Sequence, residues 1–467
     1  MKILNPFVVR RRRQEEANAP SVQCTLDPVT EDAVRLHLVP PRSGGLRRRA
    51  SLLHINGQHI VPLNHGYAAL LRHFMLELSA VAIPGQEISE EALLGVFERT
   101  ASKMHYLYPE EPKDRFIGDL GQLQDLIFRV ARGEEAPELI GHEMTLAEYA
   151  PYMRGPIRMD LAVMPMRRDG TWVCPNACAI CYASLGEAMQ VAEEEELTTE
   201  QWWHVEDVLW LAGVVQVSFT GGDPLERPDI VELVEHAQQF TTRVNTSAVT
   251  LTEEMARRLH EAQLDVMQVT VYSSDPSIHD SLVGRPGALQ RTLNGIRIAM
   301  AADIEVSVNT PLVAENAPGY AENLKCLHEQ LGVRYFTASG MLPAGGAKKK
   351  IAIGGGVPQQ ELYNYLIAAK DLAIEMGCEL DFTSPGCLSD EQLKSLGMNP
   401  PACGACLGNM AIAPDGEVLP CQSWVHHKKI LGNILRVPWK KIWNHPTCKT
   451  IRETAALKNE CPLSQEG

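Results

Sequence analysis

Three cysteines within eight residues constrain this 467-residue chain more than any other feature. The stretch reads Cys174-Pro-Asn-Ala-Cys178-Ala-Ile-Cys181-Tyr182. A loop this short puts three thiolates close enough to bind three irons of one cluster, and thiolates are the ligands that iron–sulfur clusters select. Three protein ligands in place of four leave one iron open for a small molecule. A structural zinc loop and buried free cysteines are the alternatives, although zinc sites usually combine paired Cys-x-x-Cys or Cys/His motifs.

A second motif, Phe219-Thr-Gly-Gly-Asp-Pro-Leu225, ends the next predicted strand, which covers residues 214–220. Two adjacent glycines let the backbone approach a ligand closely, because no side chain stands in the way. Alone, such a sequence is more often only a turn. Its place at a strand end, following the cysteine loop, gives it more weight.

The loop and the turn together resemble the radical S-adenosylmethionine (SAM) enzymes, over roughly residues 155–467. The resemblance implies a [4Fe–4S] cluster held by Cys174, Cys178 and Cys181, whose open iron takes the amino and carboxylate groups of SAM. It also implies that the turn Gly221, Gly222, Asp223, Pro224 contacts the methionine amino group. The usual acidic residue of this turn is Glu, and the shorter Asp leaves backbone contacts as the secure ones.

The same resemblance assigns further SAM contacts. It places Tyr182 near the adenine, Thr270 and Arg285 near the carboxylate, and Asn309 near the ribose. For the last three, a structural role at a strand end is an equal alternative. No catalytic side chain is named, because the SAM-derived radical needs neither a general base nor a nucleophile.

Strands alternate with helices from residue 156 to about 345, which predicts an α/β fold with a parallel sheet and outer helices. The roughly six units match the partial (β/α)6 barrel that the resemblance implies. In parallel barrels the chemistry lies at the carboxyl ends of the strands, where both motifs fall.

The N-terminal part is predicted as a flexible basic arm over 1–50 and a small domain over 51–135. Asn56-Gly57 between two apolar runs is a strong hairpin signal, and three helices follow it. A hairpin followed by three helices resembles the winged-helix peptide-recognition element of ribosomal-peptide maturation systems, which adds a leader peptide to its sheet edge. An ordinary α/β appendage and a DNA-binding winged helix are the alternatives. Residues 136–155 are interpreted as a linker.

A cysteine-rich end follows a bridging region over 346–400. In residues 401–467, Pro414-Asp-Gly416 predicts a hairpin turn that brings Cys406 and Cys421 together. The spacing of Gly416 and Cys421, with four residues between them, resembles the opening of the SPASM auxiliary-cluster domain. Too few cysteines follow for two clusters, so we expect one auxiliary cluster, as in the shortened twitch variant. The resemblance implies Cys406, Cys421 and Cys461 as ligands, with Cys448 or Cys403 as the fourth; a structural zinc is the competitor.

Composition narrows the setting of the chain. A formal net charge of -15 argues against a general nucleic-acid binder. No apolar run is long enough to span a bilayer, so no membrane partner is expected. Twelve cysteines at metal-type spacings, without an export signal, favour a reducing cytoplasm.

The combination suggests a SAM-dependent maturase for a ribosomally made precursor peptide. Hydrogen abstraction by a 5′-deoxyadenosyl radical would modify the core peptide by crosslinking, epimerisation or backbone excision, which the sequence does not distinguish. A precursor peptide and a reductant such as flavodoxin or ferredoxin are the expected partners. The alternatives are a radical SAM oxidase of a protein Cys or Ser or of a small alcohol, and a non-catalytic, zinc-stabilised peptide-binding protein.

Overall fold

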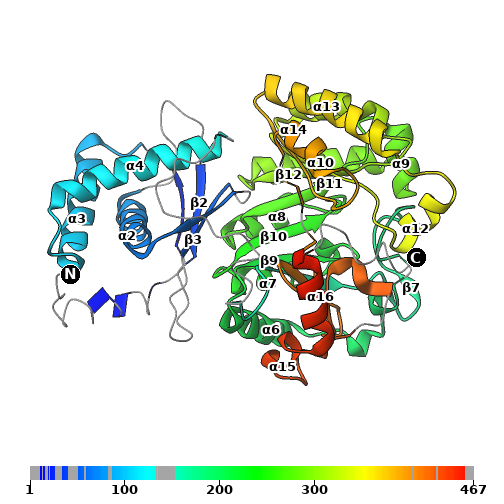
Figure 1. Ribbon diagram of the computed structural model, residues 1–467, viewed down its shortest axis with the longest axis horizontal. Coiled ribbons are helices and arrows are strands. Elements are labelled where there is room, and N and C mark those ends of the chain that lie inside the picture. The colour runs from blue at the N-terminus through cyan, green and yellow to red at the C-terminus, as the bar shows by residue number, and fades with distance from the viewer. Residues whose placement is uncertain are drawn as a thin grey trace. The chain divides into compact units, whose positions relative to one another are not determined.

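The computed structural model of the chain divides into two compact units (Figure 1). The first is Met1–Glu143 with Gln239–Thr241, and the second is Met144–Gln238 with Thr242–Gly467. No helix of the described residues is both long and apolar enough to cross a membrane. The structure describes residues 11–12, 14–15, 19, 22–26, 34–39, 51–56, 59–82, 87–132, 134, 153–184, 186–398, 400–401, 403–426 and 430–457.

The N-terminal unit is an antiparallel sheet followed by helices. Its strands pair in chain order, and the residues that start two of the helices cap them with their side chains. Asn64 Oδ1 accepts from the Tyr67 amide at 3.0 Å, and Ser89 Oγ accepts from the Ala92 amide at 3.3 Å. Asn56 adopts a left-handed φ of 50° in the predicted hairpin turn. The elements are β1 (Val22–Leu26), β2 (Val34–Val39), β3 (Ser51–Ile55), β4 (His59–Leu63), α2 (His65–Val81), α3 (Glu90–Leu107) and α4 (Lys113–Ala131).

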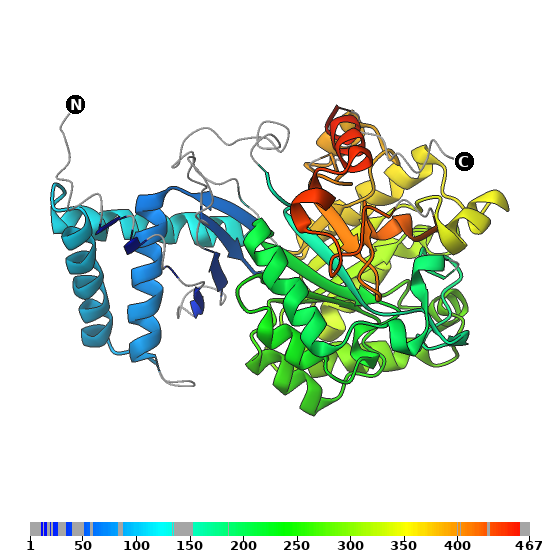
Figure 2. The same ribbon diagram turned by 90° about the horizontal axis from the view of Figure 1, so that it is seen from below.

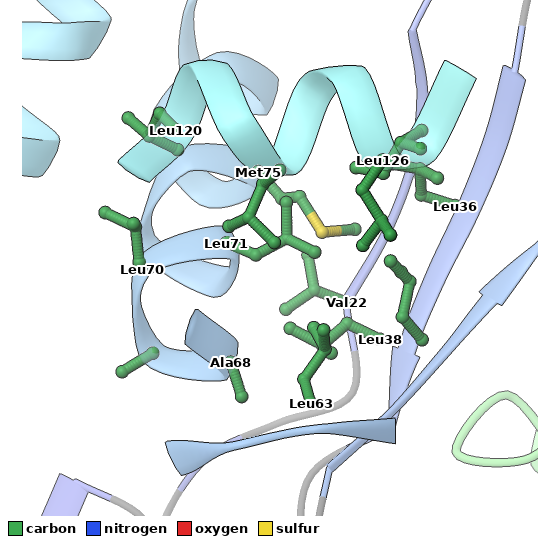
Figure 3. Close-up of a cluster of buried hydrophobic side chains, with 14 of the residues drawn as sticks. Val22, Leu36, Leu38, Leu63, Ala68, Leu70, Leu71, Met75, Leu120 and Leu126 are labelled. Carbon is green, nitrogen blue, oxygen red and sulfur yellow. The ribbon is translucent and has the colours of Figure 1, made fainter. Parts of the chain in front are cut away.

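One face of this sheet forms the core of the unit. Alternate residues of a strand point to the same face, and Leu36, Leu38 and Leu53 are fully buried on it. Figure 3 shows this face packed against Met75 of α2 and Leu126 of α4. The predicted hairpin and three helices are therefore present, on a sheet with two more strands.

The expected basic arm over residues 1–50 is wrong for its described part. Strands β1 and β2 contribute buried residues to the core of the unit, and β2 has alternating apolar residues. The basic and proline-rich segments on either side of β2 obscure this alternation in the sequence. Arg11 Nη1 donates to the Tyr106 carbonyl at 2.7 Å, and Arg12 Nε donates to the Leu107 carbonyl at 2.8 Å. These carbonyls end α3, where backbone acceptors lack helical partners and cations are favoured.

The second unit contains a sheet whose parallel strands alternate with helices, as predicted. Its order is β14-β13-β12-β11-β10-β9-β5-β15-β16. The expected bridging region over 346–400 contributes helix α13 and strand β14, and β14 extends this sheet. The strands are β5 (Arg158–Met164), β9 (Gln216–Gly221), β10 (Thr241–Thr246), β11 (Val266–Thr270), β12 (Val306–Pro311), β13 (Tyr335–Ser339) and β14 (Glu379–Phe382). The helices between them are α6 (Thr199–Ala212), α7 (Ile230–His236), α8 (Glu253–Glu261), α9 (Pro276–Val283), α10 (Ala288–Ala301), α11 (Tyr320–Leu331), α12 (Gly345–Ala352) and α13 (Gln359–Glu375).

The cysteine-rich C-terminal segment continues the same sheet. Strand β15 (Asn409–Ile412) pairs in parallel with β5 and antiparallel with β16 (Val418–Leu419), around the predicted turn at Gly416 (Figure 2). This segment therefore lies directly beside the strand that precedes the cysteine loop. The smaller elements of the unit are β6 (Arg167–Arg168), β7 (Thr171–Trp172), β8 (Gln190–Val191), α14 (Asp390–Ser395), α15 (Trp439–Trp443) and α16 (Pro446–Leu457).

A hydrogen-bonded Glu–His pair between α6 and α7 predicts a pH dependence of stability. His236 Nδ1 lies 2.7 Å from Oε2 of the fully buried Glu206. Burial raises the pKa of Glu206 to about 7, and the hydrogen bond to Glu206 raises the pKa of His236. Both pKa values are raised, so the folded state holds more protons than the unfolded state. The pair's contribution is full below the ordinary pKa of Glu and falls as the pH rises through about 7.

Glu206→Gln should therefore remove part of this pH dependence. We expect the wild-type advantage over the variant in urea unfolding to fall by about 1–3 kcal/mol between acidic pH near 5 and pH 8. Glu235→Gln, at an exposed position of α7, is the matched control. A difference between wild type and Glu206→Gln that does not vary with pH would contradict the prediction.

Candidate metal centre and cofactor site

The cysteine loop follows β7 and is tied to α9 by its backbone. The Ala177 and Ala179 amides donate to the Val283 and Leu282 carbonyls, each at 2.8 Å. The loop also meets the glycine turn, because the Cys174 thiol donates to the Gly222 carbonyl at 3.3 Å. The two motifs recognised in the sequence thus form one site at the carboxyl ends of β5 and β9.

The environment of the three thiols suits a cationic cofactor. Burial raises the pKa of Cys174, Cys178 and Cys181, to about 12 for Cys178. The carboxylate of Asp223 raises the pKa of Cys174 further. Thiolates are poorly stabilised there by the protein alone, and bound iron would supply the positive charge that a coordinating thiolate needs. The donor set therefore fits a three-cysteine iron–sulfur cluster.

The glycine turn packs so closely that side chains are excluded. Gly221 has a φ of +132°, and a Cβ there would lie 2.1 Å from the Met164 carbonyl oxygen. A Cβ on Gly222 would lie 2.4 Å from the Pro165 carbonyl oxygen. The turn is thus held against the segment that follows β5, with its backbone beside Cys174.

Asp223 joins the ends of two strands and does not project freely into the site. It is buried, and its Oδ1 accepts from the Thr246 hydroxyl at 2.6 Å and from the Leu225 amide at 3.2 Å. Its Oδ2 accepts from the Ser247 amide at 2.9 Å and the Ser247 hydroxyl at 2.6 Å. The carboxylate is occupied by protein donors, which favours the backbone of the turn for contacts to SAM. Pro224 is buried and begins the short helix that follows.

Two further residues assigned from the resemblance lie together. Thr270 and Asn309 are register partners at the ends of β11 and β12. Oδ1 of Asn309 accepts from the Thr337 hydroxyl at 3.0 Å, which leaves its amide N–H groups for a ligand. Arg285 is exposed, and its Nε donates to the Pro175 carbonyl at 3.2 Å. Arg285 is thus anchored on the cysteine loop itself.

Tyr182 connects the cysteine loop to the C-terminal hairpin. Its hydroxyl lies 3.4 Å from Oε1 of Gln422, the residue after Cys421. Its ring packs in a cluster that includes Ala411 and Leu419 of the hairpin. The expected adenine contact of Tyr182 stays a prediction, and these contacts give it a second role in joining the two cysteine segments.

Sequence reasoning missed Tyr272, whose hydroxyl is hydrogen-bonded to the Cys178 sulfur. No motif marks this residue, although it ends the apolar run that forms β11. Hydrogen bonds to ligand sulfurs help set the reduction potential of iron–sulfur clusters.

Tyr272→Phe should make the potential of the cluster more negative by roughly 20–65 mV. A hydrogen bond contributes a free energy of about 0.5–1.5 kcal/mol. We convert this free energy to a potential at about 59 mV for each tenfold change in a one-electron equilibrium. A redox titration followed by electron paramagnetic resonance measures the shift. Tyr320→Phe removes another buried hydroxyl, on α11, and should leave the potential unchanged. Equal potentials in wild type and Tyr272→Phe would contradict the prediction.

The C-terminal segment brings together three of its predicted ligands. Cys406 and Cys448 are hydrogen-bonded, and Cys421 lies close enough to raise the pKa of Cys406. Arg452 Nη2 is 4.0 Å from the Cys448 sulfur. Cys403 is buried and precedes Cys406 by three residues in the sequence. Cys461 lies outside the described residues.

Within the described part of the chain, no three His, Cys, Asp or Glu side chains are gathered tightly enough to share a single metal ion. The individual ligands named from the sequence therefore stay predictions. Every cysteine that the structure describes is free of disulfide bonds.

Comparisons with known proteins agree with this geometry. Residues 171–319 match the radical SAM superfamily, and residues 403–463 match the SPASM iron–sulfur cluster-binding domain. The AdoMet-dependent haem synthase of Methanosarcina barkeri is 24% identical over 311 residues, which are 63% of this chain and 87% of the relative. The PqqA peptide cyclase of Gluconobacter oxydans is 27% identical over 306 residues, covering 64% of this chain and 81% of the relative.

The fold extends the likeness beyond these segments. The crystal structure of Streptococcus suis SuiB bound to precursor peptide SuiA superposes with a TM-score of 0.55 at 14% identity. It covers 86% of this chain and 87% of SuiB. The cysteine loop, the glycine turn and the C-terminal cysteines thus lie in the two matched domains, whose cofactors are iron–sulfur clusters and SAM. The chain therefore contains a radical SAM domain and a SPASM domain, and it is a radical SAM enzyme.

Proposed function

We propose that the enzyme binds the leader of a ribosomally synthesised precursor peptide and modifies its core. The observation that carries this proposal is the N-terminal unit, an antiparallel sheet covered on one face by three helices. The structural likeness to peptide-bound SuiB covers 86% of the chain. This share is larger than the second unit, so the likeness includes part of the N-terminal unit. Similarity to a PqqA peptide cyclase supports the same substrate class.

The leader would add to the exposed edge of the N-terminal sheet. Among the described strands, β4 is at one edge of this sheet and pairs with β3 alone, so its outer backbone groups can pair with an extended peptide. Pro62 is exposed on β4 and has no amide hydrogen, which interrupts the outer ladder at one position. This interruption would favour one register of the bound peptide.

The second unit would position SAM and the core peptide. The cysteine loop would hold the cluster, and the Gly221–Gly222 backbone and the amide of Asn309 would orient SAM. When bound, the cluster and SAM supply a 5′-deoxyadenosyl radical that abstracts a hydrogen atom from an unactivated carbon. Asp223 fixes the strand ends on which these contacts depend. Of the C-terminal cysteines, Cys406, Cys421 and Cys448, with Cys403 or Cys461, would hold one auxiliary cluster near the same sheet edge.

Leader dependence tests the proposal with the unmodified enzyme. Short open reading frames are first sought beside the gene, and a peptide encoded there is supplied as the full precursor, as the core alone, and as the core with the leader added separately. We expect SAM-dependent modification of the core of the full precursor, detected by mass or by chiral amino-acid analysis, with at least about a tenfold loss of kcat/KM for the core alone. Equal rates for precursor and core would overturn the proposed role of the N-terminal unit.

The alternative enzymatic function predicts a different result in this test. An oxidase of protein Cys or Ser, or of a small alcohol, would act on substrates without a leader.

We further propose a reducing cytoplasm as the setting and a flavodoxin or ferredoxin as the one-electron donor, because the cluster must be reduced before SAM is cleaved. The chemical outcome on the core peptide is read from the mass change: a crosslink lowers the mass by two hydrogens, whereas epimerisation leaves it unchanged.

A further inference from the structure

Helix α12 (Figure 1) carries the sequence's only run of three lysines, and its first turn contacts the cysteine loop. The Gly346 amide donates to the Cys181 carbonyl at 2.9 Å. A Cβ on Gly345 would lie 2.5 Å from that same oxygen, and a Cβ on Gly346 would lie 2.4 Å from the Ala179 carbonyl oxygen. Both glycines are therefore needed for this contact. A side chain at either position would push the start of α12 away from the loop.

The outer face of α12 is basic and partly apolar. Lys348 and Lys349 are exposed and form no ion pair with any described residue, whereas Lys350 pairs with Glu315. Ile351 and Ile353 are 39% and 80% exposed. We name these four exposed side chains, Lys348, Lys349, Ile351 and Ile353, the α12 patch.

A second cation lies on the same loop. Arg285 is exposed and donates to the Pro175 carbonyl, at the other end of the cysteine loop from α12. The loop is thus flanked by exposed positive charge, although the chain as a whole has a formal net charge of -15. A local basic region on an acidic protein attracts an acidic partner to one place and disfavours its approach elsewhere.

We propose that the α12 patch docks an acidic one-electron donor protein, of the flavin or iron–sulfur class. Its lysines would pair with carboxylates around the donor's cofactor, and its two isoleucines would form the apolar centre that interfaces require. Docking there places the donor beside the loop that carries Cys181. The transfer moves one electron and no atoms: the donor is oxidised by one electron, and the enzyme's cluster is reduced by one.

This inference rests on the radical SAM activity and goes beyond the choice of peptide substrate. The leader-binding unit takes no part in it, so the two proposals fail separately. A peptide substrate with acidic residues is the competing occupant of the patch, and the experiment distinguishes it from the donor.

The test compares Lys348→Glu/Lys349→Glu with Lys440→Glu/Lys441→Glu. The second pair is exposed on α15 and changes the net charge equally. Binding of a purified flavodoxin to the reconstituted enzyme is measured by calorimetry at low and high salt. Cluster reduction is followed by absorbance, with reduced flavodoxin and separately with dithionite.

We expect the α12 variant to bind flavodoxin at least about tenfold more weakly than the α15 variant, with a smaller salt dependence. Its cluster should be reduced correspondingly slowly by flavodoxin and at the wild-type rate by dithionite. The milder Lys348→Ala/Lys349→Ala variant should give an intermediate loss. Equal losses in the α12 and α15 variants, a loss that extends to dithionite, or weaker binding of the precursor peptide alone would each overturn the proposal.

Discussion

Gly222→Ala is expected to slow SAM cleavage by at least about 100-fold while leaving the cluster in place. The new Cβ would lie 2.4 Å from the Pro165 carbonyl oxygen and 3.5 Å from Cys174 Cβ. The Pro165 carbonyl belongs to the backbone and cannot rotate away as a side chain can, so the glycine turn itself must move. A displacement of about 1 Å in a positioning element lowers rates by about 100-fold. We therefore expect at least this loss in the rate of 5′-deoxyadenosine formation.

Iron content separates this effect from general misfolding. The variant should keep the iron and sulfide content of the wild type, because the three cysteine ligands are unchanged. Gly319→Ala is the matched control, since a Cβ there would meet no atom within 4 Å. Wild-type SAM cleavage by Gly222→Ala would show that the close approach of this turn is not required.

Asp223→Ala should cause a large loss of stability in the second unit. Its buried carboxylate accepts four hydrogen bonds, from Leu225, Thr246 and Ser247. Removing it leaves these donors, which are buried or half-buried, without this acceptor. Hydrogen bonds to a charged group contribute about 1.5–3 kcal/mol each and do not add fully, so we expect a loss of about 3–5 kcal/mol.

Urea unfolding without SAM measures this loss, because a residue that acts only on SAM would not affect it. Asp371→Ala, at an exposed position of α13, should change stability by less than about 0.5 kcal/mol. Asp223→Asn, which keeps part of the hydrogen bonding, should be intermediate. A stable Asp223→Ala protein with weakened SAM binding alone would assign the carboxylate to SAM and contradict its role in joining the strand ends.

The cysteine loop, the glycine turn and the alternating sheet could be predicted from sequence because each is local. Three cysteines in one loop need no tertiary information, and the alternation of strands and helices determines a parallel sheet with its motifs at one end. The predicted hairpin at Asn56 and the helix start at Ser89 are confirmed for the same reason.

Contacts between distant segments could not be predicted in this way. The bond from Tyr272 to Cys178 and the contact of α12 with Cys181 join segments that carry no shared motif. The four donors to Asp223 also come from two strand ends. Charged residues around β1 and β2 obscure a short apolar alternation, so the sequence predicts an arm where the structure has two strands.

Iron and sulfide counting tests the assignment of a radical SAM centre most directly. The enzyme is reconstituted anaerobically as wild type and as Cys174→Ala/Cys178→Ala/Cys181→Ala, and 5′-deoxyadenosine is measured in both. A radical SAM cluster plus one auxiliary cluster predicts about eight irons in the wild type and about four in the variant, with SAM cleavage only in the wild type. Zinc without iron or sulfide in both proteins, or SAM cleavage by the variant, would contradict this assignment.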